Sequence, residues 1–356
     1  MNYKSIFNLL GILLGIFSLS FVPPIVLAFA YEESSKDIFL YSFIFFAILG
    51  ASIWTATRQE NLPLNISDGF IITTLFWVVL ACAGSIPFYF FGLNISDAIF
   101  ESVSGITTTG ATTIIGLDNL PKSILLYRQL LQWIGGMGLI VLAVAVMPAL
   151  GIGGGQLYKM ELPGSHGNQK LTPKITDSAK ALWKIYVGLT LMCAILYLLS
   201  GMNLFDSIAH SLTTVAGGGF STHDESIGFF NSTLIEAVCI IFMLLSAASF
   251  AVHYAAIFGG KPLKYFYDSE FKFFLSVVLL IIIVSLIVHG VSNSFADVFS
   301  LFSSTIFHVV SIVTTSGFTT ENFSLWPGFL PYLLLVGAFM GACSQSVGGV
   351  LRLGEC

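Results

Sequence analysis

A chain of 356 residues that is 56% hydrophobic and only 9% charged, with a mean hydropathy of +0.90, carries more apolar surface than an ordinary soluble core can hide. The net charge is −5, and we expect no nucleic-acid partner. No HExxH, GxSxG or P-loop motif occurs, so the sequence does not indicate an enzyme. Long uncharged runs instead match the roughly 30 Å of hydrocarbon in a lipid bilayer.

In chain order, hydropathy and helix breakers predict two N-terminal helices, followed by helices arranged around shorter segments. The first run, Ile6–Ala30, is too long for a signal-peptide core, so we interpret it as a spanning helix. Three intervening segments, 97–109, 205–215 and 298–313, are too short or too polar to span, which predicts re-entrant pore helices. The expected spans lie near residues 6–30, 38–56, 70–91, 124–150, 182–201, 233–258 and 272–289, and a last one starts near 328.

Each expected pore helix leads into a short Thr/Ser/Gly-rich stretch, called a glycine segment below. The first is 107–111 (Thr-Thr-Thr-Gly-Ala), the second 215–220 (Val-Ala-Gly-Gly-Gly-Phe) and the third 314–318 (Thr-Thr-Ser-Gly-Phe). Lipid cannot satisfy bare N–H and C=O groups, so irregular backbone at membrane depth must be buried in protein or line a watery path. Repeated exposed carbonyls are typical of an ion selectivity filter; the alternative is a set of tight turns between packed helices. The predicted filter residues are Thr108, Thr109, Gly110, Gly217, Gly218, Gly219, Thr315, Ser316 and Gly317.

Shared spacings indicate that the three units are repeats. An Asn and an Asp precede the glycine of the first segment, Gly110, by sixteen and thirteen residues, and the same intervals precede Gly219. A polar residue also stands nine positions before Gly110, Gly219 and Gly317. We expect the Asp residues to cap the pore helices and the other three to form hydrogen bonds behind the filter, with a proton relay as the alternative. The residues are Asn94 and Asp97, Asn203 and Asp206, and Glu101, His210 and His308.

Basic residues predict the orientation of the chain in the membrane. If the N-terminus is cytoplasmic, the outer segments hold only Lys36, Lys122 and Arg128, and every glycine segment lies toward the outer face. The inner segments then carry Lys4, Arg58, Lys159, Lys170, Lys174, Lys180, Lys184, Lys261, Lys264, Lys272 and Arg352.

Several stretches resemble the Trk/Ktr/HKT superfamily of potassium transporters, and its bacterial Trk potassium-uptake membrane subunit in particular. They are ESVSGITTTGATT (101–113), TTVAGGGFSTHDES (213–226), VVSIVTTSGFTTENFSLWP (309–327), and QLYKMELPG with LTPKITDSAKALWKIY (within 156–186). The two additional N-terminal helices also resemble this branch, and the resemblance covers essentially residues 1–343. Glycine in all three segments matches the potassium-preferring pattern of the superfamily.

The resemblance implies potassium uptake across the bacterial cytoplasmic (inner) membrane, with K⁺ as the substrate at the filter residues and no covalently bound cofactor. It also implies a homodimer, a cytosolic nucleotide-binding regulatory subunit and no catalytic residues. The family places a Gly/Ser-rich gating loop in the second helix of its third repeat. The corresponding residues here are Gly341, Cys343, Ser344, Gly348 and Gly349.

The expected fold is an all-α polytopic membrane protein with three helix–pore helix–helix repeats and two additional N-terminal helices. The family carries a fourth repeat, so we expect a chain truncated before that repeat. The alternative to potassium uptake is therefore a truncated, non-conducting fragment or a frameshifted product. The expected domains are 1–60 (two N-terminal helices), 61–150 (first pore repeat), 151–180 (cytoplasmic loop), 181–260 (second pore repeat) and 261–356 (third pore repeat, incomplete at its last helix).

Overall fold

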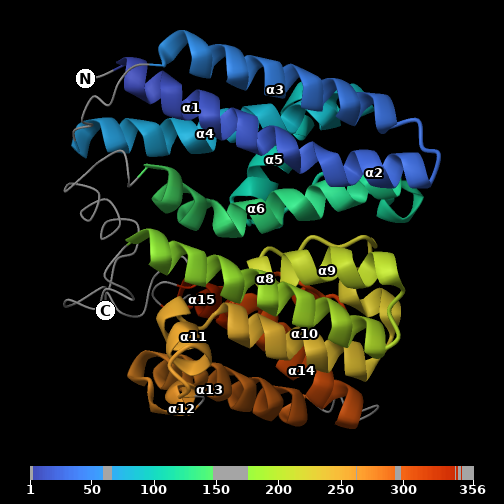
Figure 1. Cartoon of the computed structure of the whole chain (residues 1–356). Helices are drawn as coiled ribbons and strands as arrows, with labels where there is room; N and C mark the ends of the chain where they lie inside the picture. Colours follow the sequence, from blue (N-terminus) through green and yellow to red (C-terminus); the bar gives the residue numbers. More distant parts are fainter. Residues whose placement is uncertain are drawn as a thin grey trace. The chain divides into compact units, whose positions relative to one another are not determined.

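A computed structural model of the chain describes residues 3–58, 66–146, 175–261, 263–292, 298–340, 342–343 and 346. Within these ranges the regular structure consists of α-helices and short 3₁₀ turns (Figure 1). The described residues divide into two compact units between Lys180 and Ala181.

The first unit holds the helices that lead to the first glycine segment. α1 and α2 are joined by the 3₁₀ turn Leu19–Phe21 and form one apolar span of 28 residues. The turn precedes Pro23 and Pro24, which begin α2 because proline fits the first turn of a helix. The helices are α1 (Tyr3–Ser18), α2 (Val22–Ala30), α3 (Lys36–Thr57), α4 (Ile66–Phe91), α5 (Ile95–Ile106) and α6 (Lys122–Val146), and α8 (Ile175–Leu199) begins just before the division.

Glycines allow α1 and α3 to approach closely. A Cβ placed on Gly50 of α3 would lie 2.7 Å from the Gly15 backbone nitrogen and 2.8 Å from the Gly11 carbonyl oxygen, too close for any side chain. Gly11 and Gly15 are four residues apart and lie on one face of α1, the small-residue spacing that is common where membrane helices pack. The two N-terminal helices therefore form a backbone-to-backbone contact.

Aromatic rings fill the core of this unit around Tyr127 of α6. Its ring lies 5.2–5.6 Å, between centroids, from the rings of Phe21, Phe39 and Phe88. The phenol hydroxyl donates to the Gly84 carbonyl at 2.9 Å, so the one polar atom of this buried ring is satisfied. The 3₁₀ turn Leu19–Phe21, α3 and α4 thereby pack around one side chain of α6.

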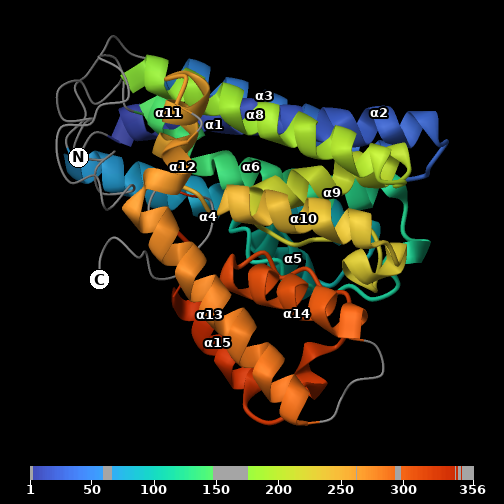
Figure 2. The same ribbon diagram turned by 90° about the horizontal axis from the view of Figure 1, so that it is seen from below.

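The second unit contains the other two glycine segments. In it α13, α14 and α15 pack on one another, and α10 packs on both α9 and α14 (Figure 2). The helices are α9 (Leu204–Ala216), α10 (Thr233–Ser246), α11 (Phe250–Ile257), α12 (Lys264–Tyr267), α13 (Ser269–Val291), α14 (Val298–Val313) and α15 (Leu330–Met340), with most of α8.

The run predicted as one span over 233–258 is broken, because the chain bends by 102° between α10 and α11. Ser249 starts the new helix by accepting a hydrogen bond from the Ala251 N–H at 3.2 Å. The carbonyls freed at the end of α10 find other donors: the His253 ring donates from Nε2 to Leu245 at 2.9 Å, and the Cys343 N–H donates to Ala247 at 3.1 Å. These bonds satisfy backbone that would otherwise stand bare at the break.

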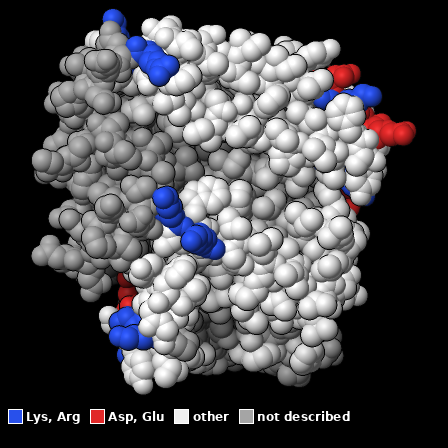
Figure 3. All heavy atoms as spheres, in the orientation of Figure 1, with Lys and Arg blue, Asp and Glu red and all other residues white. Residues whose placement is uncertain are grey.

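The other long predicted spans coincide with helices, and five helices in the described ranges are long and apolar enough to cross a bilayer. Figure 3 shows that charged side chains gather near helix ends, whereas the flanks of the helices between them are uncharged. This distribution is that of a protein whose helices cross the hydrocarbon core and whose ends reach the polar layers.

Candidate functional site

Two of the three pore helices begin with the same side-chain cap. Asn94 and Asn203 are the N-cap residues of α5 and α9, and each accepts a hydrogen bond from the N–H of the Asp three residues later, at 2.8 and 2.9 Å. Each Asn also donates from Nδ2 to that carboxylate at 2.6 Å. The prediction that Asp97 and Asp206 cap these helices is therefore wrong. In each helix the Asn is the N-cap, and the Asp in the first turn accepts a hydrogen bond from the Asn side chain.

All three pore helices end in the same backbone turn. The residue two before the segment glycine has a left-handed backbone, with φ of 55° at Thr108, 65° at Gly217 and 60° at Thr315. The N–H of the next residue returns to the carbonyl five positions earlier, at 2.9–3.0 Å. This is a Schellman cap, which satisfies late carbonyls of the helix before the chain turns away. The donor–acceptor pairs are Thr109–Ser104, Gly218–Thr213 and Ser316–Ser311.

The segment glycines themselves also share one conformation. Their φ angles are 76° at Gly110, 74° at Gly219 and 79° at Gly317, a region that glycine enters without strain. In each segment two residues with positive φ are separated by one residue without it, and sequence spacing alone does not reveal this pattern. Thr108 and Thr315 are β-branched residues in the left-handed region, a costly conformation that is typical of functional backbone.

Within the second unit, the second and third glycine segments lie against each other. A Cβ on Gly219 would overlap the Ser316 carbonyl oxygen, so glycine is required for this approach. The chain segments that follow them are also joined by hydrogen bonds. The Gly228 N–H donates to the Thr319 carbonyl at 3.1 Å, and the Thr319 N–H donates to Ser226 Oγ at 3.3 Å. The first glycine segment belongs to the first unit.

Behind the first segment, a buried ion pair forms hydrogen bonds with the extended residues that follow Gly110. Glu101 Oε1 accepts from the Thr113 N–H at 2.7 Å and from the Thr112 hydroxyl at 2.5 Å. Arg128 of α6 donates from Nε to the other carboxylate oxygen at 3.1 Å and from Nη2 to Thr112 at 3.0 Å. Both charged side chains are fully buried, so each depends on the other for its countercharge.

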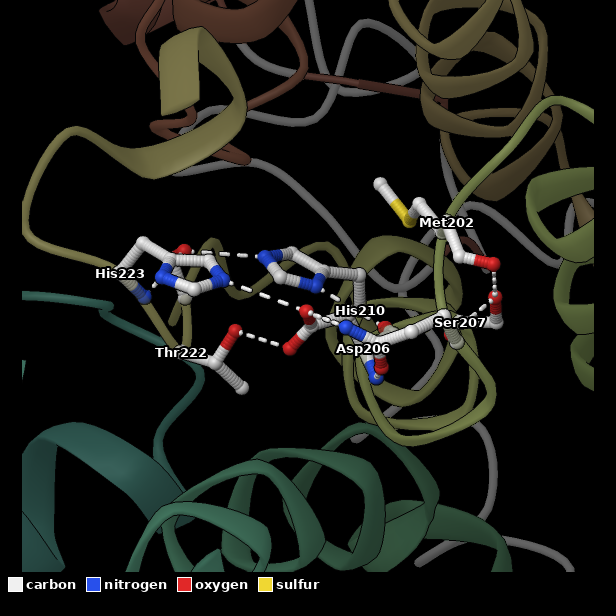
Figure 4. A network of polar contacts seen from close by, with 8 residues as sticks. Met202, Asp206, Ser207, His210, Thr222 and His223 are labelled. Atoms are coloured by element: carbon white, nitrogen blue, oxygen red, sulfur yellow. Dashed lines mark hydrogen bonds and ion pairs between the residues drawn. The ribbon is translucent and has the colours of Figure 1, made fainter. Parts of the chain in front are cut away.

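Behind the second segment, a histidine has the same role. His210 Nδ1 donates to the Asp206 carbonyl at 3.0 Å, which leaves Nε2 to accept from the Ser221 hydroxyl at 2.9 Å. Figure 4 shows Thr222 and His223 directed at the Asp206 carboxylate, at 2.7 and 3.2 Å. Burial raises the pKa of Asp206, but the hydrogen bonds from His223 and Thr222 together with the nearby His210 outweigh burial and lower that pKa to about 2.

The third segment repeats the arrangement with His308 of α14. Its Nδ1 lies 2.9 Å from the Ser304 carbonyl oxygen, and Nε2 lies 3.3 Å from the Thr320 nitrogen and 3.2 Å from the Glu321 carbonyl oxygen. The residue nine positions before each segment glycine thus forms a hydrogen bond with a residue two or three positions after that glycine. The prediction that these three residues form hydrogen bonds near the glycine segments is confirmed.

The described part of the predicted gate is Cys343. It is buried, with 1% of its surface exposed, and its N–H is bonded to the Ala247 carbonyl at the break between α10 and α11. Gly341, Ser344, Gly348 and Gly349 lie outside the described residues, as do Lys170 and Lys174 in the predicted cytoplasmic loop.

The site offers oxygen atoms to a ligand. Carbonyls and hydroxyls are the polar groups of the glycine segments, and they suit a hard cation better than soft N/S-type ligands do. Across the described ranges, no group of three or more His, Cys, Asp or Glu side chains could hold a metal ion. Any ion bound at the segments would therefore be held by backbone and hydroxyl oxygens.

The helices and half-helices define a multi-pass membrane protein. A family model described as "Cation transport protein", TrkH, matches residues 35–355, and the chain belongs to this family. It is similar to the Trk system potassium uptake protein TrkH of Vibrio parahaemolyticus, with 45% identity over 99% of this chain and 74% of the relative. The corresponding protein of Escherichia coli K12 is 43% identical over the same shares.

A solved structure also shows that the chain is similar to TrkH proteins. The crystal structure of the potassium transporter TrkH from Vibrio parahaemolyticus is 44% identical and superposes with a TM-score of 0.87. The match covers 98% of this chain and 72% of that chain. The chain thus spans about three quarters of the length of these relatives.

Proposed function

We propose that this protein carries potassium ions across the bacterial cytoplasmic (inner) membrane, as a transporter rather than an enzyme. The observation that carries the proposal is the common backbone of the three glycine segments, each with a Schellman cap followed by a left-handed glycine. The names of the relatives, which are potassium uptake proteins, support K⁺ as the substrate.

In this proposal each pore helix has two effects on the ion. The C-terminal end of a helix carries a partial negative charge, so α5, α9 and α14 each favour a cation near their glycine segments. The left-handed turns then direct carbonyls of Thr108, Thr109 and Gly110, and of their counterparts, toward the ion in place of water. Each helix–pore helix–helix repeat supplies one quadrant of the filter, and no covalent cofactor takes part.

The remaining features of the proposal concern topology and partners. The N-terminus is cytoplasmic, which places the glycine segments toward the outer face and most lysines inside. The chain assembles as a homodimer and binds a cytosolic nucleotide-binding regulatory subunit. Gly341 and Cys343, with the Gly/Ser-rich residues after them, act as the gate below the filter.

Reconstitution of the purified full chain into vesicles tests the function directly. K⁺ uptake driven by a gradient, with Na⁺ excluded, is the expected result, and it should be lost on Gly219→Asp. Vesicles that take up neither ion would contradict the proposal. The alternative of a non-conducting fragment is not favoured by the relatives, which match 99% of this chain and carry potassium-uptake names.

A further inference from the structure

A groove on the surface of the first unit lies between α3 and α4. It has a volume of about 520 Å³ and lies where α3 begins and α4 ends. Large apolar side chains form its rim, and Tyr41 and Phe90 are 68% and 66% exposed. The lining residues are Asp37, Ile38, Tyr41, Ser42, Phe45, Ile86 and Phe90.

The interior of the groove offers little to water. The Ser42 hydroxyl is already bonded to the Ile38 carbonyl of its own helix at 2.8 Å, and the other side chains deep in the groove are hydrocarbon. Both walls belong to helices that are candidate membrane spans, so the medium that meets the groove is hydrocarbon chains.

One end of the groove is charged. Asp37, in the first turn of α3, lines it, and Lys36 precedes Asp37 in the chain, with its ammonium 5.8 Å from the centre of the Phe29 ring. Asp37 thus places a carboxylate at the end of the groove that meets the headgroup layer, whereas Lys36 is not among the lining residues. The positive end of the α3 dipole favours an anion at the same place.

We propose that the groove binds a phospholipid with an ammonium headgroup, of which phosphatidylethanolamine is the simplest case. One acyl chain lies along Phe45, Ile86 and Phe90, the ammonium faces Asp37, and the phosphate lies near the start of α3. The orientation predicted from the lysines places this lipid in the outer leaflet. An apolar slot with one carboxylate at its end is complementary to a single amphiphile with a cationic end, whereas a second copy of the chain would have to insert a side chain into the slot. This inference does not rest on the proposed transport function.

Native mass spectrometry of the purified full chain tests the proposal. After delipidation and titration with phosphatidylethanolamine or phosphatidylglycerol, the wild type should retain phosphatidylethanolamine preferentially. Ile86→Trp fills the groove and should abolish this retained lipid, whereas Ile44→Trp, on α3 outside the groove lining, should leave it unchanged. Asp37→Asn should keep a bound lipid but reduce the preference for phosphatidylethanolamine by about two- to fivefold, the worth of one partly exposed ion pair.

A measurement on the wild type makes the test independent of how the variants fold. A photoactivatable phosphatidylethanolamine with its reactive group on the acyl chain should label Phe45, Ile86 or Phe90. Labelling spread evenly over the exposed helices, or equal retention by the Ile86→Trp and Ile44→Trp variants, would overturn the proposal. So would cross-linking of Phe90→Cys between two copies with no lipid retained, because the occupant would then be a second chain.

Discussion

Gly219 is a position in the glycine segments where one added methyl group should be strongly destabilising. Its backbone is left-handed, with φ of 74°, and a Cβ would overlap the backbone carbonyl oxygen of Ser316 in the neighbouring segment. Gly317 provides a matched control in the same unit: its φ is 79°, but a Cβ there would meet no atom within 4 Å. The two Gly→Ala substitutions therefore share the conformational cost and differ in the overlap.

The expected magnitudes follow from these two terms. A left-handed backbone costs an alanine about 1–2 kcal/mol relative to glycine. At Gly219 the overlap adds about 1–3 kcal/mol, because the neighbour is main chain and cannot rotate away as a side-chain end would. Gly219→Ala should thus lower the free energy of unfolding by about 2–5 kcal/mol, and Gly317→Ala by about 1–2 kcal/mol.

Thermal unfolding of the purified variants in one detergent measures the difference, and ion uptake by vesicles shows its consequence. Because relief of the overlap moves the Ser316 carbonyl, Gly219→Ala should also reduce the preference for K⁺ over Na⁺ more than Gly317→Ala does. Equal losses for the two variants, or a Gly219→Ala protein as stable as the wild type, would refute the close approach of the two segments.

Other substitutions test the contacts around the pore helices. Arg128→Met leaves Glu101 buried without its countercharge and should cost about 3–5 kcal/mol of stability, seen as a large drop in melting temperature; an unchanged melting temperature would contradict the buried pair. The folded-state pKa of Asp206, about 2, lies below that of an unfolded carboxyl, so its stabilisation is present above about pH 4 and lost as the pH falls toward 2. The stability gap between wild type and Asp206→Asn should accordingly be constant from neutral pH to about pH 5 and shrink below it; a gap that stays constant to pH 3 argues against the network. Gly135→Ala would place a Cβ on the Ile106 carbonyl at the end of α5 and should destabilise the first pore helix by about 1–3 kcal/mol, measured by unfolding, whereas Gly188→Ala, with open space around it, should not.

Much of the fold follows from the sequence because spans and half-helices differ in length and polarity. The segments 97–109, 205–215 and 298–313 were expected as pore helices, and α5, α9 and α14 occupy them. Their spacings also located the residues behind the glycine segments, since a repeat keeps its internal distances even when residue types change.

Features that depend on contacts distant in sequence could not be read in this way. Nothing in the run 233–258 is polar enough to interrupt a span, and the break at Ala247 exists because His253 and Cys343 satisfy the freed carbonyls. The left-handed backbone of Thr108 and Thr315 could not be predicted from the sequence for another reason. A β-branched residue argues locally against that conformation, and the Schellman caps of the pore helices impose it.

The three residues behind the glycine segments show what the repeats preserve. In each case a residue two or three positions after the glycine offers an N–H or hydroxyl donor. The helix before the glycine supplies the acceptor, nine positions before that glycine. A histidine meets this need without a net charge, because its Nδ1–H is bonded within the helix and Nε2 remains as the acceptor. Glu101 meets it with a buried charge, which is tolerated only beside Arg128. The countercharge on α6 is therefore a consequence of the residue chosen at position 101, and the second and third repeats, with His210 and His308, have no need of one.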